Sequence, residues 1–166
     1  AQHRNGRHKE GGEKMREDLA GVEPAVHKSG ISVPYHWWAG ETASRFFTAI
    51  RDEQKIMGIR CARCGKVFLP PRKTCPSCFS QNEEWVPLST EGELISFTVA
   101  RRQLAALPRK VPVIYGLIKL DGADTALLHM LGEVDPSEVR IGMRVAAKFS
   151  DNRTGSIMDI DYFTPV

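Results

Sequence analysis

The sequence predicts a mostly β protein with helices on its N-terminal side, and three observations predict this fold class. Apolar residues recur with helical spacing before residue 58, four cysteines follow in two close pairs, and the second half of the chain alternates apolar with polar residues. The 166 residues are enough for one ordinary domain or for a small module joined to a barrel. We therefore divide the chain into a polar arm (1–33), a helical segment (34–58), a metal-binding ribbon (59–90) and a β-barrel (91–166).

The N-terminal third of the chain changes character near residue 34. The arm is polar, contains five glycines and has no periodic apolar face. From residue 35 to 57 the pattern is helical, with a second, longer helix predicted over 41–56. Two adjacent aromatic pairs, Trp37–Trp38 and Phe46–Phe47, fall in this segment and cannot all face one small core. They either pack on the ribbon or anchor another subunit, because aromatic side chains dominate interface hot spots.

The four cysteines stand as Cys61-Ala-Arg-Cys64 and Cys75-Pro-Ser-Cys78, two Cys-x-x-Cys pairs separated by ten residues. This ligand set predicts a structural zinc ion in a ribbon, since four sulfur ligands leave no open position for water or substrate. Gly65 follows the first pair, at a position that suits φ > 0. Two disulfides are the alternative, but the chain has no other cysteine and no signal-like N-terminus. Iron in the same cage would make a one-electron carrier.

Period-two alternation after the ribbon predicts five strands, with tight connections at Gly122 and at 152–155. A short helical turn is predicted at 135–139, between the third and fourth strands. This strand number and turn position are those of an OB-fold, a small closed barrel. The predicted strands span residues 91–101, 113–120, 125–133, 144–150 and 157–163.

The net charge of +3 is unevenly distributed. Residues 51–80 carry seven basic and two acidic side chains, and 101–120 carry five basic and none acidic, whereas the last 46 residues hold four basic against eight acidic. Such local positive charge attracts the phosphates of nucleic acid or of coenzyme A. Most surface cations are merely solvated, but guanidinium groups suit phosphate well. The candidate coenzyme A contacts are Arg63, Arg72, Lys73, Arg101 and Arg102.

Hydropathy and histidine placement add two expectations. No apolar run approaches the ~20 residues of a membrane helix, so we expect a cytoplasmic protein that does not act at a membrane. His129 lies between Leu128 and Met130 in an apolar strand. It is a candidate general base if it faces a cleft, and a hydrogen-bonded wall residue otherwise.

The motifs from residue 46 to 102 resemble a known family in order and without interruption. They are Phe46-Phe47-Thr48-Ala49-Ile50, the two cysteine pairs, Phe68-Leu69-Pro70-Pro71-Arg72 and Gly92-Glu93-Leu94-Ile95-Ser96-Phe97-Thr98. The chain is similar to the OB-fold proteins with a rubredoxin-like zinc ribbon that associate with acyl-CoA enzymes. The distinguishing element is Pro-Pro-Arg between the cysteine pairs, and only the arm before Tyr35 lies outside the resemblance.

This resemblance implies a non-catalytic accessory subunit of a thiolase-type acyltransferase. Members of the family pair with thiolase-like chains that are thought to carry the catalytic cysteine and histidine, as in steroid side-chain aldolases and archaeal thiolase complexes. All four cysteines here are assigned to the metal, which leaves no thiol to carry an acyl group. The most specific expectation is benzoylsuccinyl-CoA thiolase of anaerobic toluene degradation. It implies an acyl-CoA ligand and a hetero-oligomer of two accessory and two thiolase chains.

Two other function classes use the same features. A nucleic-acid-binding zinc-ribbon and OB-fold module would track phosphates with its basic segments, but it would also need aromatic platforms on the barrel face. The barrel aromatics are Phe97, Tyr115, Phe149, Tyr162 and Phe163, and the acidic C-terminal strands disfavour this interpretation. An electron carrier of rubredoxin type would require iron in place of zinc.

Overall fold

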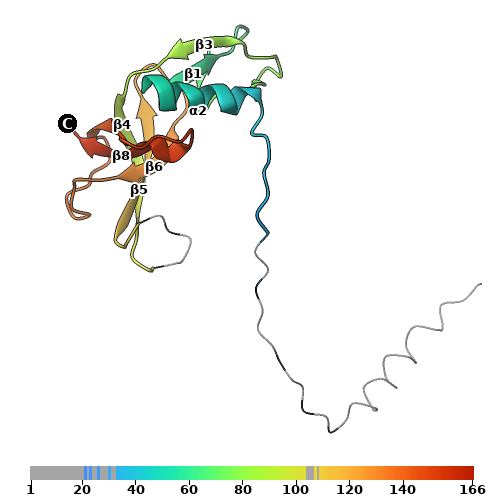
Figure 1. Ribbon diagram of the computed structural model, residues 1–166. Helices are drawn as coiled ribbons and strands as arrows, with labels where there is room; N and C mark the ends of the chain where they lie inside the picture. Colours follow the sequence, from blue (N-terminus) through green and yellow to red (C-terminus); the bar gives the residue numbers. More distant parts are fainter. Residues whose placement is uncertain are drawn as a thin grey trace, which may run out of the picture. The chain divides into compact units, whose positions relative to one another are not determined.

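A computed structural model describes residues 33–103, 107 and 109–166, together with positions 21, 23, 26 and 30. The predicted polar arm therefore lies almost entirely outside the described residues. The chain divides into two compact units, 1–37 and 38–166, and the second unit holds all the regular elements described below (Figure 1).

One helix, α2 (Glu41–Glu53), precedes the ribbon. The prediction of a further helix before it is wrong, because residues 34–40 have no regular structure. Gly40 adopts φ 84° at the start of α2, a conformation that cannot continue a helix towards the N-terminus. The helix also ends before the predicted residue 56, since Gln54 closes it in the left-handed conformation at φ 53°.

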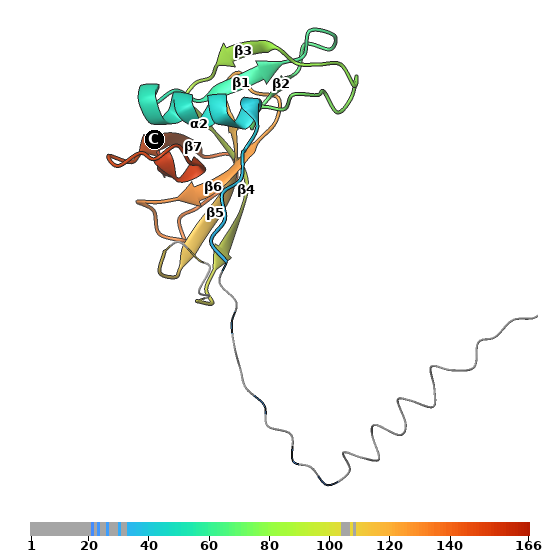
Figure 2. The same cartoon turned by 45° about the vertical axis from the view of Figure 1, so that its right-hand side comes forward.

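The ribbon is a three-stranded antiparallel sheet with the order β2-β1-β3. Its strands are β1 (Met57–Arg60), β2 (Val67–Phe68) and β3 (Glu84–Pro87). They enclose a small core of Ile59, Phe68 and two buried cysteines, with Trp85 packed against it. Figures 1 and 2 show this sheet on one side of α2, with the barrel on the other.

The second half of the chain forms a closed five-stranded barrel in the order β4-β5-β6-β8-β7, which confirms the predicted OB-fold. All neighbouring strands are antiparallel except β6 and β8, which pair in parallel through Leu131 and Phe163. The strands are β4 (Glu91–Ala100), β5 (Val113–Leu120), β6 (Leu127–Leu131), β7 (Arg144–Phe149) and β8 (Ile160–Pro165).

The third strand is shorter than predicted, Leu127–Leu131 rather than 125–133, and two further barrel elements also differ from those observed. The fifth strand begins three residues late, because Ser156 and Asp159 form a capping box around the 3-10 turn η1 (Ile157–Asp159). The predicted helical turn at 135–139 is a single hydrogen-bonded turn, closed by the Glu138 N–H donating to Asp135 O at 2.9 Å. The late start of the fifth strand and the turn at 135–139 both arise from local polar hydrogen bonds, which the spacing of hydrophobic residues does not reveal.

The main core is shared by α2, the ribbon and the barrel. Phe46 and Ile50 of α2 are buried together with barrel residues such as Leu94, Ile118 and Phe163. Phe46 therefore joins the barrel core rather than packing on the ribbon. Its neighbour Phe47 is only partly buried, and Trp37 and Trp38 remain 73% and 81% exposed.

Four hydrogen bonds attach Val67 and Leu69 of the ribbon to the turn between β5 and β6. The Val67 N–H donates to Asp124 Oδ2 at 2.8 Å, and the Asp124 N–H donates to Val67 O at 2.9 Å. The Thr125 hydroxyl accepts from the Leu69 N–H at 2.7 Å and donates to Leu69 O at 2.9 Å. Because both partners are part-buried, these bonds fix β2 against the turn between β5 and β6.

Candidate metal centre and binding surfaces

The four cysteine sulfurs converge as the sequence predicts. The Sγ atoms of Cys61, Cys64, Cys75 and Cys78 all lie within 4.8 Å of one another. The Sγ atoms of Cys64 and Cys75 are 3.8 Å apart, too far for a disulfide bond. Two thiolates at ~2.3 Å from a tetrahedral ion stand about 3.8 Å apart, so the sulfur arrangement fits a metal ion of zinc's size and geometry.

The first cysteine loop owes its shape to two backbone hydrogen bonds. The Cys61 N–H donates to Lys66 O at 2.9 Å, and the Gly65 N–H donates to Cys61 O at 2.8 Å. Gly65 has φ 74°, the left-handed conformation expected for this position. The turn therefore holds Cys61 and Cys64 on the same side of the loop.

The second loop repeats this pattern. The Cys75 N–H donates to Ser80 O and the Phe79 N–H donates to Cys75 O, both at 2.9 Å. Phe79 stands where the first loop has Gly65, and it adopts φ 55° with its ring 81% exposed. A phenylalanine in this conformation is strained, and sequence spacing alone gives no sign of it.

Ionisation of all four thiols requires a cation in the site. Hydrogen bonding to the Ser80 hydroxyl and to the Cys64 N–H lowers the pKa of Cys61 to about 6. The neighbouring Cys64 thiol, burial and Cys75 together raise the pKa of Cys78 to about 12. Four thiols this close do not all ionise at neutral pH unless a positive ion balances them. The donor set therefore fits zinc, which these four residues would hold without an open coordination position.

The five predicted coenzyme A contacts are all exposed and lie at two ends of the molecule. Arg63, Arg72 and Lys73 belong to the cysteine loops of the ribbon. Arg101 and Arg102 follow β4, at the end of the barrel that points away from the ribbon (Figure 1). A ten-residue strand spans roughly 30 Å, so the structure does not bring the five cations into one patch.

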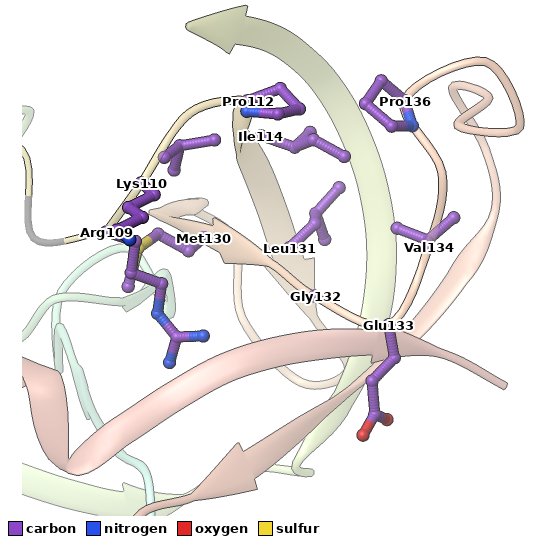
Figure 3. Close-up of a pocket in the computed structure, with 11 residues that line it drawn as sticks. Arg109, Lys110, Pro112, Ile114, Met130, Leu131, Gly132, Glu133, Val134 and Pro136 are labelled. Atoms are coloured by element: carbon purple, nitrogen blue, oxygen red, sulfur yellow. The ribbon is translucent and has the colours of Figure 1, made fainter. Parts of the chain in front are cut away.

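Two cations that sequence analysis did not single out line a pocket of about 290 Å³ at the barrel end. Figure 3 shows Arg109 and Lys110 on one side of this pocket and Glu133 on the other, with Leu131 between them. Arg109 forms an ion pair with Asp161. Both cations belong to the basic segment 101–120, so its charge was the signal that could have found them.

His129 is a wall residue of the barrel. It is 5% exposed, its Nδ1 accepts from the Met130 N–H at 2.9 Å, and its Nε2 lies 3.1 Å from Ile157 O. A neutral ring with its proton on Nε2 satisfies both bonds. Burial lowers the pKa of His129. Both ring nitrogens are engaged, which favours the wall interpretation over a general base.

A groove of about 440 Å³ opens between α2, the segment after β2 and the outer face of the barrel. Its ten lining side chains are all apolar. Leu117 of β5 and Leu128 of β6 pair directly across the strands at its edge. In OB-folds this face binds nucleic acid through aromatic and basic residues. Here it presents aliphatic side chains, which disfavours the nucleic-acid interpretation.

Four of the five barrel aromatics named above pack in the core or against cations. Phe163 is fully buried, and Phe97 and Phe149 pack against the core. The Tyr162 ring lies beneath two cations, Arg109 at 5.2 Å and Lys148 at 5.3 Å. These four rings therefore do not offer stacking platforms to bases.

Two family models match consecutive parts of the chain. Residues 48–84 match the rubredoxin-like zinc ribbon domain of ChsH2, and residues 85–150 match the C-terminal OB-fold domain of ChsH2. Together they cover more than half of the 166 residues. The chain belongs to this zinc-ribbon and OB-fold family. Membership agrees with the cysteine cluster, the closed barrel and the order in which they occur.

Two relatives of this zinc-ribbon and OB-fold protein are named as a scaffold protein and as a thiolase subunit. A DUF35 domain-containing scaffold protein of Methanocaldococcus jannaschii is 28% identical over 106 residues, which are 63% of this chain and 74% of the relative. The benzoylsuccinyl-CoA thiolase subunit BbsA of Thauera aromatica is 37% identical over 65 residues, 39% of this chain and 44% of that subunit. The second similarity is higher in identity but shorter.

A solved structure shares the fold. A chain of the Ltp2-ChsH2(DUF35) aldolase superposes with a TM-score of 0.60 at 23% identity, over 78% of this chain and 98% of that chain. Within the described part of our chain, no helix has the length and apolar character needed to cross a lipid bilayer.

Proposed function

We propose that this protein is a non-catalytic accessory subunit of a thiolase-type acyl-CoA enzyme. The proposal rests on family membership together with one observation, that all four cysteines lie in the metal-binding cluster. Thiolase-type acyl transfer needs a cysteine nucleophile, and all four cysteines of this chain converge on one metal-binding cluster. The nucleophile would therefore come from a second chain, which agrees with relatives named as a scaffold protein and as a thiolase subunit.

Benzoylsuccinyl-CoA thiolase is the most specific form of this proposal. It is supported by the 37% identical stretch shared with the BbsA subunit. In this form, the complex would be cytoplasmic, contain two accessory and two thiolase chains, and cleave an aromatic acyl-CoA ester. The zinc ion, held by Cys61, Cys64, Cys75 and Cys78, would have a structural role only.

Reconstitution tests the proposal directly. A thiolase-type chain from the same genome is assayed for acyl transfer with and without this protein, at equal concentrations. We expect low activity for either chain alone and at least a tenfold higher rate for the mixture. If this protein alone catalysed acyl transfer, or if no thiolase-type chain responded to it, the accessory-subunit proposal would be wrong.

Coenzyme A contact by the exposed cations is a separate proposal. Arg72 lies in the ribbon without an ion pair among the described residues, so its guanidinium is available to a phosphate. Replacing Arg72 with alanine should leave folding intact and raise the KM of the assembled enzyme for its acyl-CoA ester several-fold, as expected for one lost charge-assisted bond. An unchanged KM would exclude this role for Arg72.

A further inference from the structure

The apolar groove described above combines three parts of the protein. Phe47 comes from α2, Pro70 and Pro71 from the segment after β2, and Ile157 from η1, while the barrel contributes Leu117 and Leu128. The ribbon, the helix and the barrel must all be in place to form it. The hydrogen bonds that the Val67 and Leu69 N–H groups donate to Asp124 and Thr125 hold that arrangement.

The apolar surface continues beyond the groove across three strands. Leu128 is 62% exposed and Leu117 is 36% exposed, and they face each other in the β5–β6 ladder. On β4, Ile95 is 38% exposed at a bulge, next to Ser96, the residue that pairs with Leu117. An outer barrel face normally alternates polar residues at such positions. Three aliphatic side chains in a row indicate a surface that another molecule covers.

The exposure of this surface favours a protein over a small ligand. Ligand pockets enclose most of a ligand's surface, whereas Leu128 at the edge of this groove is 62% exposed. Charged side chains are depleted at the centre of protein interfaces and found at their rim. The ten groove residues have this apolar character, with Arg72 directly after Pro71.

The charge of the ribbon also restricts the partner. Three cations of the barrel, Arg109, Arg144 and Lys148, form ion pairs. Within the described part of the chain, the cations between residues 61 and 80 form none; they are Arg63, Lys66, Arg72 and Lys73. A covering surface should thus present apolar side chains to the groove and carboxylates towards the ribbon.

We propose that the groove is the docking site for the thiolase-type subunit, which inserts an apolar segment flanked by acidic residues against Leu117 and Leu128. This inference rests on the proposed function and adds the surface by which the two chains associate. Leu128 is the residue to test first, because it is the most exposed side chain lining the groove on the barrel.

A matched pair of charge insertions tests the docking site. Leu128→Glu places a carboxylate in the groove, while Ile141→Glu makes the same change at a 66% exposed residue outside it. Each variant is co-expressed with the thiolase-type chain that assembles with the wild type, after a thermal melt shows that it is folded. We expect Leu128→Glu to weaken assembly at least tenfold, as loss of an interface hot spot does, and Ile141→Glu to leave it unchanged.

The outcomes separate the docking site from the proposed function. If the wild type assembles with the thiolase-type chain and Leu128→Glu assembles equally well, the groove is not the docking site, although the proposed function stands. If the wild type assembles with no thiolase-type chain, both fail. If Leu128→Glu instead dissociates a homodimer, the occupant of the groove is a second copy of this chain. If deletion of residues 1–32 exposes the groove to a hydrophobic dye, the occupant is the chain's own N-terminal segment. Either result overturns the docking proposal.

A crosslinking measurement covers the case in which Leu128→Glu fails to fold. A benzophenone amino acid is placed at position 128 in the full-length chain, and the complex is irradiated. We expect a crosslink to an apolar segment of the thiolase-type chain that contains Asp or Glu nearby. A crosslink only from position 141, and none from 128, would overturn the proposal.

Discussion

At the scale of single residues, the cysteine loops are the part of the protein that most depends on each side chain. Cys61 and Cys75 are fully buried, and all four cysteine sulfurs meet in one cluster that a bound cation would hold together. In a structural site the free energy of metal binding is also free energy of folding. The exposed Phe79 contributes strain rather than stability at its left-handed position.

Replacing Cys61 or Cys78 with serine should release the metal and unfold the ribbon. Zinc content should fall from about one ion per chain to nearly none, because three thiolates no longer complete the tetrahedral set. Metal analysis by mass spectrometry, together with a thermal melt, checks this. Ser77→Ala, an exposed position in the same loop, serves as the control and should retain its zinc. A metal-free variant that still supported full activity with the thiolase-type chain would show that the ribbon is not needed for docking.

His129 should make the protein less stable in mild acid. Burial lowers its pKa in the folded state below the usual value of about 6.5, so the unfolded chain binds a proton more readily. The contribution of His129 is therefore complete above about pH 7.5 and is lost as the pH falls through about 6.5 towards the folded pKa.

Urea unfolding of the wild type and of His129→Gln between pH 5.5 and 7.5 measures this dependence. For each protein, the free energy of unfolding is plotted against pH. The difference between the two slopes of these plots isolates the contribution of His129 from any effect of the metal site. The variant should show the flatter profile, whereas His36→Gln, at an exposed histidine, should match the wild type. Equal slopes for His129→Gln and the wild type would contradict the buried, neutral ring.

At the scale of elements, alternation predicted the barrel strands well because one face of each strand is buried. The predicted range 113–120 is that of β5, and 91–101 exceeds β4 by one residue. The helical segment was less predictable: its apolar residues suggested two helices, but Gly40 and Gln54 limit it to one. Those limits depend on backbone conformations that apolar spacing does not encode.

The stability of the junction between ribbon and barrel should depend on the Thr125 hydroxyl. Thr125→Val keeps the shape of the side chain but removes the hydroxyl that accepts from the Leu69 N–H and donates to Leu69 O. Two part-buried backbone groups then lose their partner, which should lower the free energy of unfolding by about 1–3 kcal/mol. Thr98→Val, at an exposed position of β4, should change it by less than about 0.5 kcal/mol. Denaturant titration compares the two, and equal effects would mean that the junction bonds add little.

At the scale of the whole molecule, the metal cluster and the groove differ in how far sequence can predict them. The four ligands are close in sequence, and their spacing alone implies the site. The groove requires Phe47, Pro71 and Leu128 to come together, and Leu117 meets Leu128 only through the β5–β6 register. Strand register is a tertiary property, so the separate apolar residues gave no sign of a common surface.

The positions of the cations in the fold could not be predicted from the sequence either. The uneven charge was visible in the sequence, but Arg72 and Arg101 lie at two ends of the fold, and Arg109 and Lys110 line the pocket at the barrel end. Coenzyme A contact by the five predicted cations stays a prediction, and the ribbon cations and the barrel-end cations are two separate candidate sets.

The most direct test of the central claim is native mass spectrometry of this protein, affinity-purified at low salt from its own host, with metal analysis of the same sample. The accessory-subunit account predicts a complex with a thiolase-type chain and about one zinc ion per copy of this protein. Recovery of nucleic acid, of iron in place of zinc, or of this protein without any thiolase-type chain would contradict it.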